Sequence, residues 1–233
     1  MNITTNYTKQ QIATAVAILF HVIGLGGILF FKSNFIIQST PFNLLLMFAL
    51  VIWTQEEKNM AFFVFIVTVI AAGIAVEVVG VNTGRLFGEY TYGNVLGYKV
   101  KNVPVVIGIN WFIIIYCCGV SIHTLLMKAI EKLSVETASP KKSIRALSVI
   151  VDGATLAVFF DWIMEPVAIK LGFWQWQDGE VPLYNYVCWL GVSMVLLALF
   201  HFGTFSKRNK FAVHLLLIQA MFFLILRTFL PQL

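Results

Sequence analysis

The segment FFDWIMEPVAIKLGFWQWQDGEVP, residues 159–182, places two carboxylic acids, a proline and a Trp-x-Trp motif in apolar surroundings. Asp161 and Glu165 are four residues apart, so they share one face of a helix. A charged side chain costs about 2.5–3.5 kcal/mol at the centre of a membrane helix, and such residues usually face the bundle interior and mark function. The segment therefore predicts a membrane helix with an acidic site. Interfacial carboxylates bonded to backbone amides are the alternative interpretation.

The composition of the chain predicts an all-α integral membrane protein. Of its 233 residues 59% are hydrophobic and 12% charged, and the mean hydropathy is +0.86, so polar side chains could not cover a water-facing surface. A membrane helix needs roughly 20 apolar residues. Seven segments meet this need: 10–31, 36–54, 60–80, 103–126, 145–164, 185–203 and 211–229. The expected fold is one transmembrane domain, residues 1–233, of about seven helices. Six helices are possible, because Gln38, Ser39, Thr40 and Pro41 interrupt the second segment.

The distribution of lysine and arginine predicts the orientation of the chain in the membrane. Ten of these residues fall on one side: Lys9, Lys58, Lys128, Lys132, Lys141, Lys142, Arg145, Lys207, Arg208 and Lys210. Six fall on the other: Lys32, Arg85, Lys99, Lys101, Lys170 and Arg227. We expect the side with ten to be cytoplasmic, so that loops 81–102 and 165–184 share the opposite face. The net charge of +5 then serves topology and attraction to anionic lipids, and no nucleic-acid partner is indicated.

The two halves of the chain share a weak internal repeat. Glu77 and Glu165 are each followed seven residues later by a glycine and then by an aromatic pair, Tyr90 with Tyr92 or Trp174 with Trp176. Chance matching in so aromatic a chain is the alternative. Because Gly80 and Pro166 follow the two acids, and irregular backbone at membrane depth must line a cavity or lie inside protein, we expect two broken helix ends around one polar pocket.

Other titratable residues fit this pocket less well. Asp152 lies on roughly the opposite helix face from Asp161 and is interpreted as a structural partner of a neighbouring helix. The four histidines lack the spacing of metal ligands, so no metal is expected, although His21, deep in its segment, remains a candidate proton carrier. No lysine lies within a span, which excludes a retinal Schiff base.

Four motifs resemble the membrane carotenoid biosynthesis family, of the carotenoid 1,2-hydratase and bisanhydrobacterioruberin hydratase type. They are E-x-x-G-x-x-T-G-x-x-F-G-x-Y-x-Y (77–92), P-x-x-x-x-x-N-W (104–111), D-x-x-x-E-P-x-A-x-x-x-G-x-W-x-W (161–176) and N-x-x-x-W (185–189). The resemblance implies a bacterial, isoprenoid-modifying hydro-lyase that adds water to the terminal C1–C2 double bond of an acyclic carotenoid without a cofactor. It also implies a multi-pass protein of the bacterial inner membrane that takes its substrate from the bilayer, with other carotenoid enzymes as candidate partners.

The chemistry of hydration suggests roles for the residues of these motifs. An alkene needs an acid to protonate it, and burial favours the protonated form of a carboxyl group. Glu165 is the expected acid, and Asp161 or Glu77 would position water. Aromatic faces can stabilise the resulting cation, although an interfacial aromatic belt would look similar. The predicted substrate-binding residues are Trp162, Trp174, Trp176, Tyr90, Tyr92, Asn110, Trp111, Asn185 and Trp189.

Two other functions remain open at this point. A carotenoid end-ring cyclase would use the same protonation but exclude water. A lipid or isoprenoid transporter would also use broken helices and carboxylates near the midplane. The sequence leaves open which carotenoid is used, whether one or both ends react, and the oligomeric state.

Overall fold

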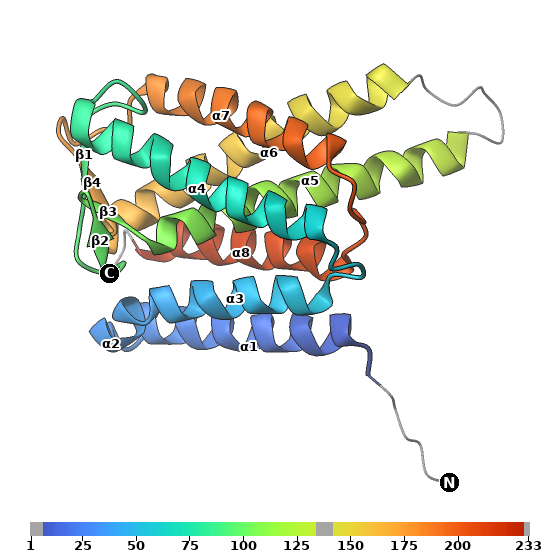
Figure 1. Cartoon of the computed structure of the whole chain (residues 1–233). Coiled ribbons are helices and arrows are strands. Elements are labelled where there is room, and N and C mark those ends of the chain that lie inside the picture. Colours follow the sequence, from blue (N-terminus) through green and yellow to red (C-terminus); the bar gives the residue numbers. More distant parts are fainter. Residues whose placement is uncertain (1–6, 134–141, 231–233) are drawn as a thin grey trace, which may run out of the picture.

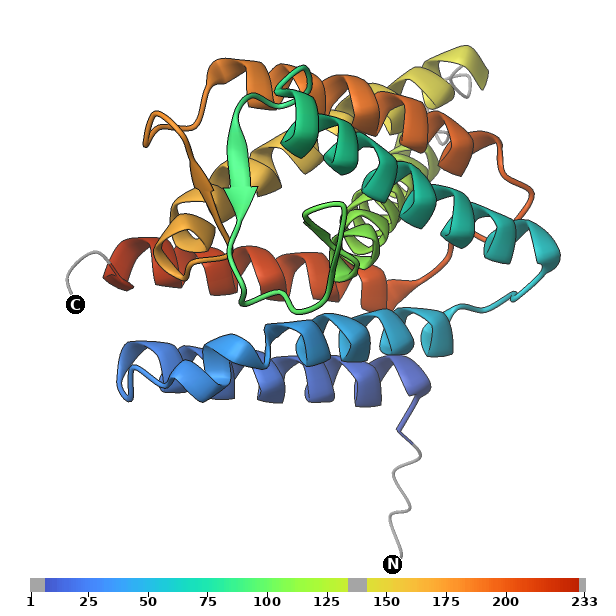
Figure 2. The ribbon, with the colours of Figure 1, turned by 60° about the vertical axis from the view of Figure 1, so that its left-hand side comes forward.

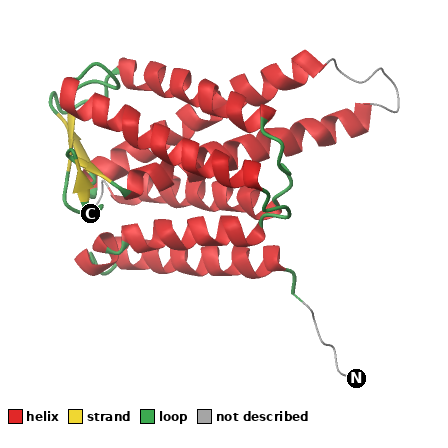
Figure 3. Ribbon diagram, viewed as in Figure 1, coloured by secondary structure: helices red, strands yellow, loops and turns green. Residues whose placement is uncertain are grey.

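The computed structural model describes residues 7–133 and 142–230, and its architecture is a helical bundle with two short sheets at one end (Figures 1 and 3). The helices are α1 Lys9–Leu29, α2 Asn34–Gln38, α3 Thr40–Thr54, α4 Met60–Thr83, α5 Val106–Leu133, α6 Lys142–Lys170, α7 Leu183–Phe202 and α8 Lys210–Phe229. The strands are β1 Tyr90–Tyr92, β2 Lys99–Val100, β3 Val103–Pro104 and β4 Trp174–Trp176. The predicted all-α membrane fold is confirmed.

Within the described part of the chain, six helices are long and apolar enough to cross a membrane: α1, α4, α5, α6, α7 and α8. The segment predicted as the weakest span is divided at Ser39 into α2 and the apolar α3, and the chain returns alongside α1 (Figure 1). The division has local causes. The Ser39 hydroxyl donates to the carbonyl of Ile36, and Pro41 lies in the first turn of α3, where its missing N–H costs no helical hydrogen bond.

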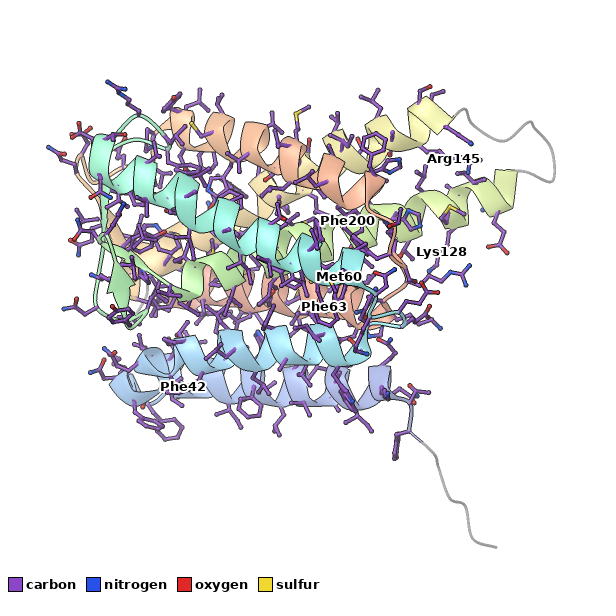
Figure 4. The ribbon with its side chains drawn as sticks, viewed as in Figure 1. Phe42, Met60, Phe63, Lys128, Arg145 and Phe200 are labelled. Carbon is purple, nitrogen blue, oxygen red and sulfur yellow. The ribbon has the colours of Figure 1, made fainter. Side chains whose placement is uncertain are left out.

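The predicted motif loops lie together at one end of the bundle. All four strands are at this end, and the described ends of α5 and α6 that carry Lys128 and Arg145 are at the other (Figures 1 and 4). Residues 134–141, including Lys141, lie outside the described residues. The outer surface is apolar: Phe42 and Met60, both labelled in Figure 4, are 74% and 76% exposed. An exposed apolar surface of this kind fits a bundle surrounded by lipid.

Helix α5 lies at the centre of the packing and contacts α3, α4, α6, α7 and α8. Small residues allow this close approach, as is usual where helices pack within a membrane. A Cβ at Gly73 of α4 would lie 2.7 Å from the side chain of Trp111, and one at Gly108 of α5 would lie 2.8 Å from the Ile70 carbonyl oxygen. The short distance between α4 and α5 brings Glu77 and Trp111 together.

The expectation of broken helix ends at the two acids is wrong. Helix α4 continues past Glu77 and Gly80 to Thr83, and α6 continues through Pro166 to Lys170. Proline has no N–H for the carbonyl four residues earlier, which here belongs to Trp162. The Arg227 Nη1 of α8 donates to that carbonyl oxygen at 2.8 Å, and this bond allows the helix to continue. The acidic pocket is therefore walled by intact helices.

The orientation can be tested by thiol labelling of single cysteines placed at exposed positions. Asp178→Cys, just after β4, and Lys101→Cys, between β2 and β3, should react with a membrane-impermeant reagent from the same side. Glu57→Cys should react from the other side, because the connection between α3 and α4 lies at the opposite end of the bundle from the strands (Figure 1). The native cysteines Cys117, Cys118 and Cys188 are buried and serve as the unlabelled background. Labelling of Asp178→Cys and Lys101→Cys from different sides would contradict the arrangement.

Candidate functional site

A short antiparallel sheet joins the two halves of the chain at the strand end of the bundle. Strand β1 follows α4 and pairs with β4, which follows α6 (Figure 2). In this pairing Tyr90 lies opposite Trp176 and Tyr92 opposite Trp174. Alternate residues of a strand point to the same side. The two tyrosines and two tryptophans therefore form one aromatic layer, with 5.0 Å between the ring centroids of Tyr90 and Trp176.

Glu77 lies beneath this layer and is 5% exposed. Its Oε2 accepts hydrogen bonds from the hydroxyls of Tyr90 at 2.5 Å and Tyr92 at 2.7 Å. Its Oε1 accepts one from the Trp111 indole N–H at 2.9 Å. Burial, and then the charge of Glu77, raises the pKa of the Tyr90 and Tyr92 hydroxyls. Both hydroxyls therefore stay protonated and donate, and the two oxygens of Glu77 are both occupied.

Glu165 occupies the equivalent place in the second half and is 2% exposed. Its Oε2 accepts from the indole N–H groups of Trp174 at 2.9 Å and Trp176 at 3.0 Å. An indole can only donate, so these bonds fix the orientation of the carboxyl group. Among the described residues none donates to Oε1, and this oxygen is available to a ligand.

Asp161 lies one turn before Glu165 on the same face of α6 and is 1% exposed. Its Oδ2 accepts a hydrogen bond from the Asn185 side-chain amide at 2.9 Å. Its Oδ1, like Oε1 of Glu165, receives no hydrogen bond from the described part of the chain. Asp161 and Glu165 thus each have one oxygen held by a hydrogen bond and one oxygen without a donor.

The three acids line one cavity, which we call the carboxylate cavity. About 30 Å³ of it is open to the centre of a water molecule, which is room for roughly two waters. The cavity is lined by Glu77, Phe87, Tyr90, Tyr92, Ile107, Asn110, Trp111, Asp161, Met164, Glu165, Trp174, Trp176, Asn185 and Trp189.

Of the predicted site residues, only Trp162 lies outside the carboxylate cavity. Adjacent residues of a helix point about 100° apart, so Trp162 cannot share the face of Asp161. It is 45% exposed, stacks on Phe159, and lies under the Arg227 guanidinium, whose carbon is 3.9 Å from the ring centroid. Its described contacts support α6 at the proline and do not reach the cavity.

Three lining residues were not predicted from the sequence. Met164 is three residues after Asp161 and could have been found from the helix face. Ile107 gave no sequence signal. Phe87 belongs to the first motif, is 2% exposed, and has a φ of +66°, a left-handed conformation that bulky residues rarely adopt. Its ring contacts those of Trp111 and Trp189, which stack on each other at 3.9 Å and 11°.

The remaining candidates lie elsewhere. His21 does not line the carboxylate cavity. Asp152 is exposed on α6, and its described hydrogen bond comes from Ser148 of the same helix rather than from a neighbouring one. Within residues 7–133 and 142–230, no group of three His, Cys, Asp or Glu side chains is placed to hold a metal ion.

Comparison with known proteins points to one family and confirms the resemblance. Residues 38–231 match the family described as "Carotenoid biosynthesis protein". Over 132 residues, 55% of the chain, the sequence is 30% identical to a protein of Haloarcula japonica named bisanhydrobacterioruberin hydratase. The matched region covers 41% of the length of that relative. No solved structure matches the chain.

The pairing of β1 with β4 can be tested at Gly93. A Cβ at Gly93 would lie 2.0 Å from the Gly172 carbonyl oxygen, so Gly93→Ala must force the two strands apart. We expect a loss of about 1–3 kcal/mol, the usual cost of overpacking, measured by thermal unfolding in detergent, together with a change in tryptophan fluorescence. Gly191→Ala is the matched control, because nothing lies within 4 Å of a Cβ there. Equal stability of the two variants would contradict the strand contact.

Proposed function

The chain belongs to the carotenoid biosynthesis protein family, and on this premise we propose that it is a membrane hydratase that adds water to the terminal C1–C2 double bond of an acyclic carotenoid. The name of the Haloarcula japonica relative supports the reaction class. The observation that carries the proposal is the pair formed by Asp161 and Glu165. In each acid one oxygen is fixed by N–H donors and the other is free. Both acids line a cavity that has room for water.

Glu165 is the proposed acid. Trp174 and Trp176 hold its Oε2, so the proton is carried on Oε1, the oxygen left free for the substrate. Two buried acids one turn apart favour sharing a single proton, because a second negative charge would be repelled by the first. This sharing keeps an acid and a base side by side in the cavity.

The proposed reaction has two steps. The proton of Glu165 bonds to C2, the electrons of the double bond form the new C–H bond, and a tertiary cation is left at C1. The oxygen of a water molecule then bonds to C1, and Asp161 Oδ1 takes the proton that the water releases. Transfer of that proton from Asp161 to Glu165 restores both groups, and the net change is the addition of one water.

The aromatic walls suit a cationic intermediate. The stacked rings of Trp111 and Trp189, and the layer formed by β1 and β4, place electron-rich faces around the cavity. A desolvated cation gains up to about 2 kcal/mol from such a contact. The indole N–H groups of Trp174 and Trp176 stabilise the carboxylate that Glu165 becomes after it has given up its proton.

Glu77 is assigned a different role from the two acids of α6. Its two oxygens already accept three hydrogen bonds, so it has little capacity to bind water or release a proton. We assign it to holding the aromatic wall in place, which leaves Asp161 as the base.

The reaction can be tested by expression in cells that accumulate lycopene, followed by the chromatographic retention, absorption spectrum and mass of each product. A hydratase adds the mass of one water at each reacting end, whereas a cyclase product keeps the mass of its substrate. Carotenoids of unchanged structure, with the protein present in the membrane, would contradict both enzyme functions.

The roles of the two acids can be tested by amide substitution. Glu165→Gln and Asp161→Asn keep the shape of the side chains but remove the acidic proton and the base, so each should lower turnover by about 10²–10⁴-fold. Asp152→Asn, exposed on the same helix, should keep normal turnover and is the matched control. Near-normal conversion by both Glu165→Gln and Asp161→Asn at normal membrane abundance would make these acids structural.

A further inference from the structure

A second, larger cavity adjoins the carboxylate cavity, and we call it the chain cavity. It measures about 310 Å³, within the range of about 300–1,000 Å³ that small-molecule pockets occupy. It lies where α1, α2 and α3 meet α5, α6 and α8. Its lining residues include Phe20, Ile23, Gly24, Phe35, Leu44, Phe160, Phe173, Phe222 and Phe223.

The two cavities share one wall residue, Asn110 of α5. Within the described part of the chain, the Asn110 side chain makes no hydrogen bond, so no partner fixes it between the cavities. The carboxylate cavity is small, with about 30 Å³ open to the centre of a water molecule, so the greater part of an isoprenoid must lie outside it. Another cavity adjoins it at Tyr90 and Trp176, but that one is lined largely by polar residues of the strand end. The chain cavity is the apolar neighbouring space, and it can accept a hydrocarbon chain.

The chain cavity is apolar and extends to the outer surface of the bundle. Phe20 and Ile23 of α1 line it and are 45% and 50% exposed, and Phe35 of α2 is 80% exposed. In a membrane these side chains face hydrocarbon, so the cavity opens to the phase in which a carotenoid is dissolved. A hydrocarbon chain can therefore enter this cavity directly from the membrane.

A small polar group of side chains also lines the chain cavity. Asn43 has a buried Oδ1 without a partner in the described residues, and Gln219 is 6% exposed. The Nδ1 of His21 is bonded to the Ala17 carbonyl, which leaves Nε2 for the cavity. Buried polar groups of this kind bind ordered water, so the cavity can supply water as well as hold a chain.

We propose that the chain cavity binds the acyclic isoprenoid chain whose end reacts in the carboxylate cavity, and that the chain passes Asn110. The proposal rests on the proposed function for its choice of substrate. The binding itself is independent of the chemistry and can be measured without turnover.

Binding can be measured as quenching of tryptophan fluorescence by lycopene, with purified protein in nanodiscs. Gly24→Leu should weaken binding by about tenfold or more, because a Cβ at Gly24 already lies 3.2 Å from Phe222 and a larger side chain must fill the cavity. Gly26→Leu is the matched control, since nothing lies within 4 Å of a Cβ there. Asp152→Asn, exposed on α6 and outside the lining of both cavities, should bind lycopene normally.

A second pair of variants covers the case in which Gly24→Leu fails to fold. Ile23→Trp should block the mouth of the cavity, and Val22→Trp, which is similarly exposed but does not line the cavity, should not. Loss of lycopene binding in the cavity variants alone supports the chain cavity even if the wild-type protein hydrates nothing. Equal binding by Gly24→Leu and Gly26→Leu, or by Ile23→Trp and Val22→Trp, would overturn it, whatever the outcome for hydration.

Discussion

The strand end of this bundle depends on the hydrogen bonding of buried carboxyl groups. A buried carboxylate is costly without hydrogen-bond donors, and the helices that carry Glu77 and Glu165 use their own N–H groups in the helical backbone. The donors come instead from the short strands that follow each helix and from Trp111 of α5. Strand pairing, the aromatic layer and the close packing of α4 on α5 all serve this arrangement.

The two halves of the site follow the internal repeat, but they differ in how their acids are hydrogen-bonded. Each half provides an acid on a helix and two aromatic donors on the next strand, and the antiparallel register of β1 and β4 brings these donors together. The halves differ in the number of donors and in the second acid. Glu77 is occupied on both oxygens, whereas Glu165 keeps a free oxygen beside Asp161. This asymmetry is the basis of the different roles proposed for the two acids.

The sequence predicted the membrane fold, the order of the helices and most of the cavity lining, because apolar length and the positions of rare polar residues carry that information. It did not predict the pairing of β1 with β4, since strands of three residues have almost no periodic signal and their partners are far apart in the chain. The continuity of α6 was also missed. Pro166 indicates a break when it is considered alone, and the Arg227 that replaces the missing donor lies in the last helix. Trp162 was assigned to the pocket from its place in the motif, although adjacent residues of a helix point about 100° apart and it stacks on Phe159 of the same helix.

The bond from Arg227 to the Trp162 carbonyl has a consequence for biosynthesis. The chain emerges from the ribosome from its N-terminus, so α6 enters the membrane before α8 has been made. Until α8 arrives, the carbonyl opposite Pro166 has no donor from within its own helix, and an unpaired carbonyl in hydrocarbon is costly. The turn of α6 before Pro166 therefore gains its full set of hydrogen bonds only when the last helix is in place. A nascent chain that stops short of α8 would leave the Trp162 carbonyl without the Arg227 donor, in the helix that carries both acids.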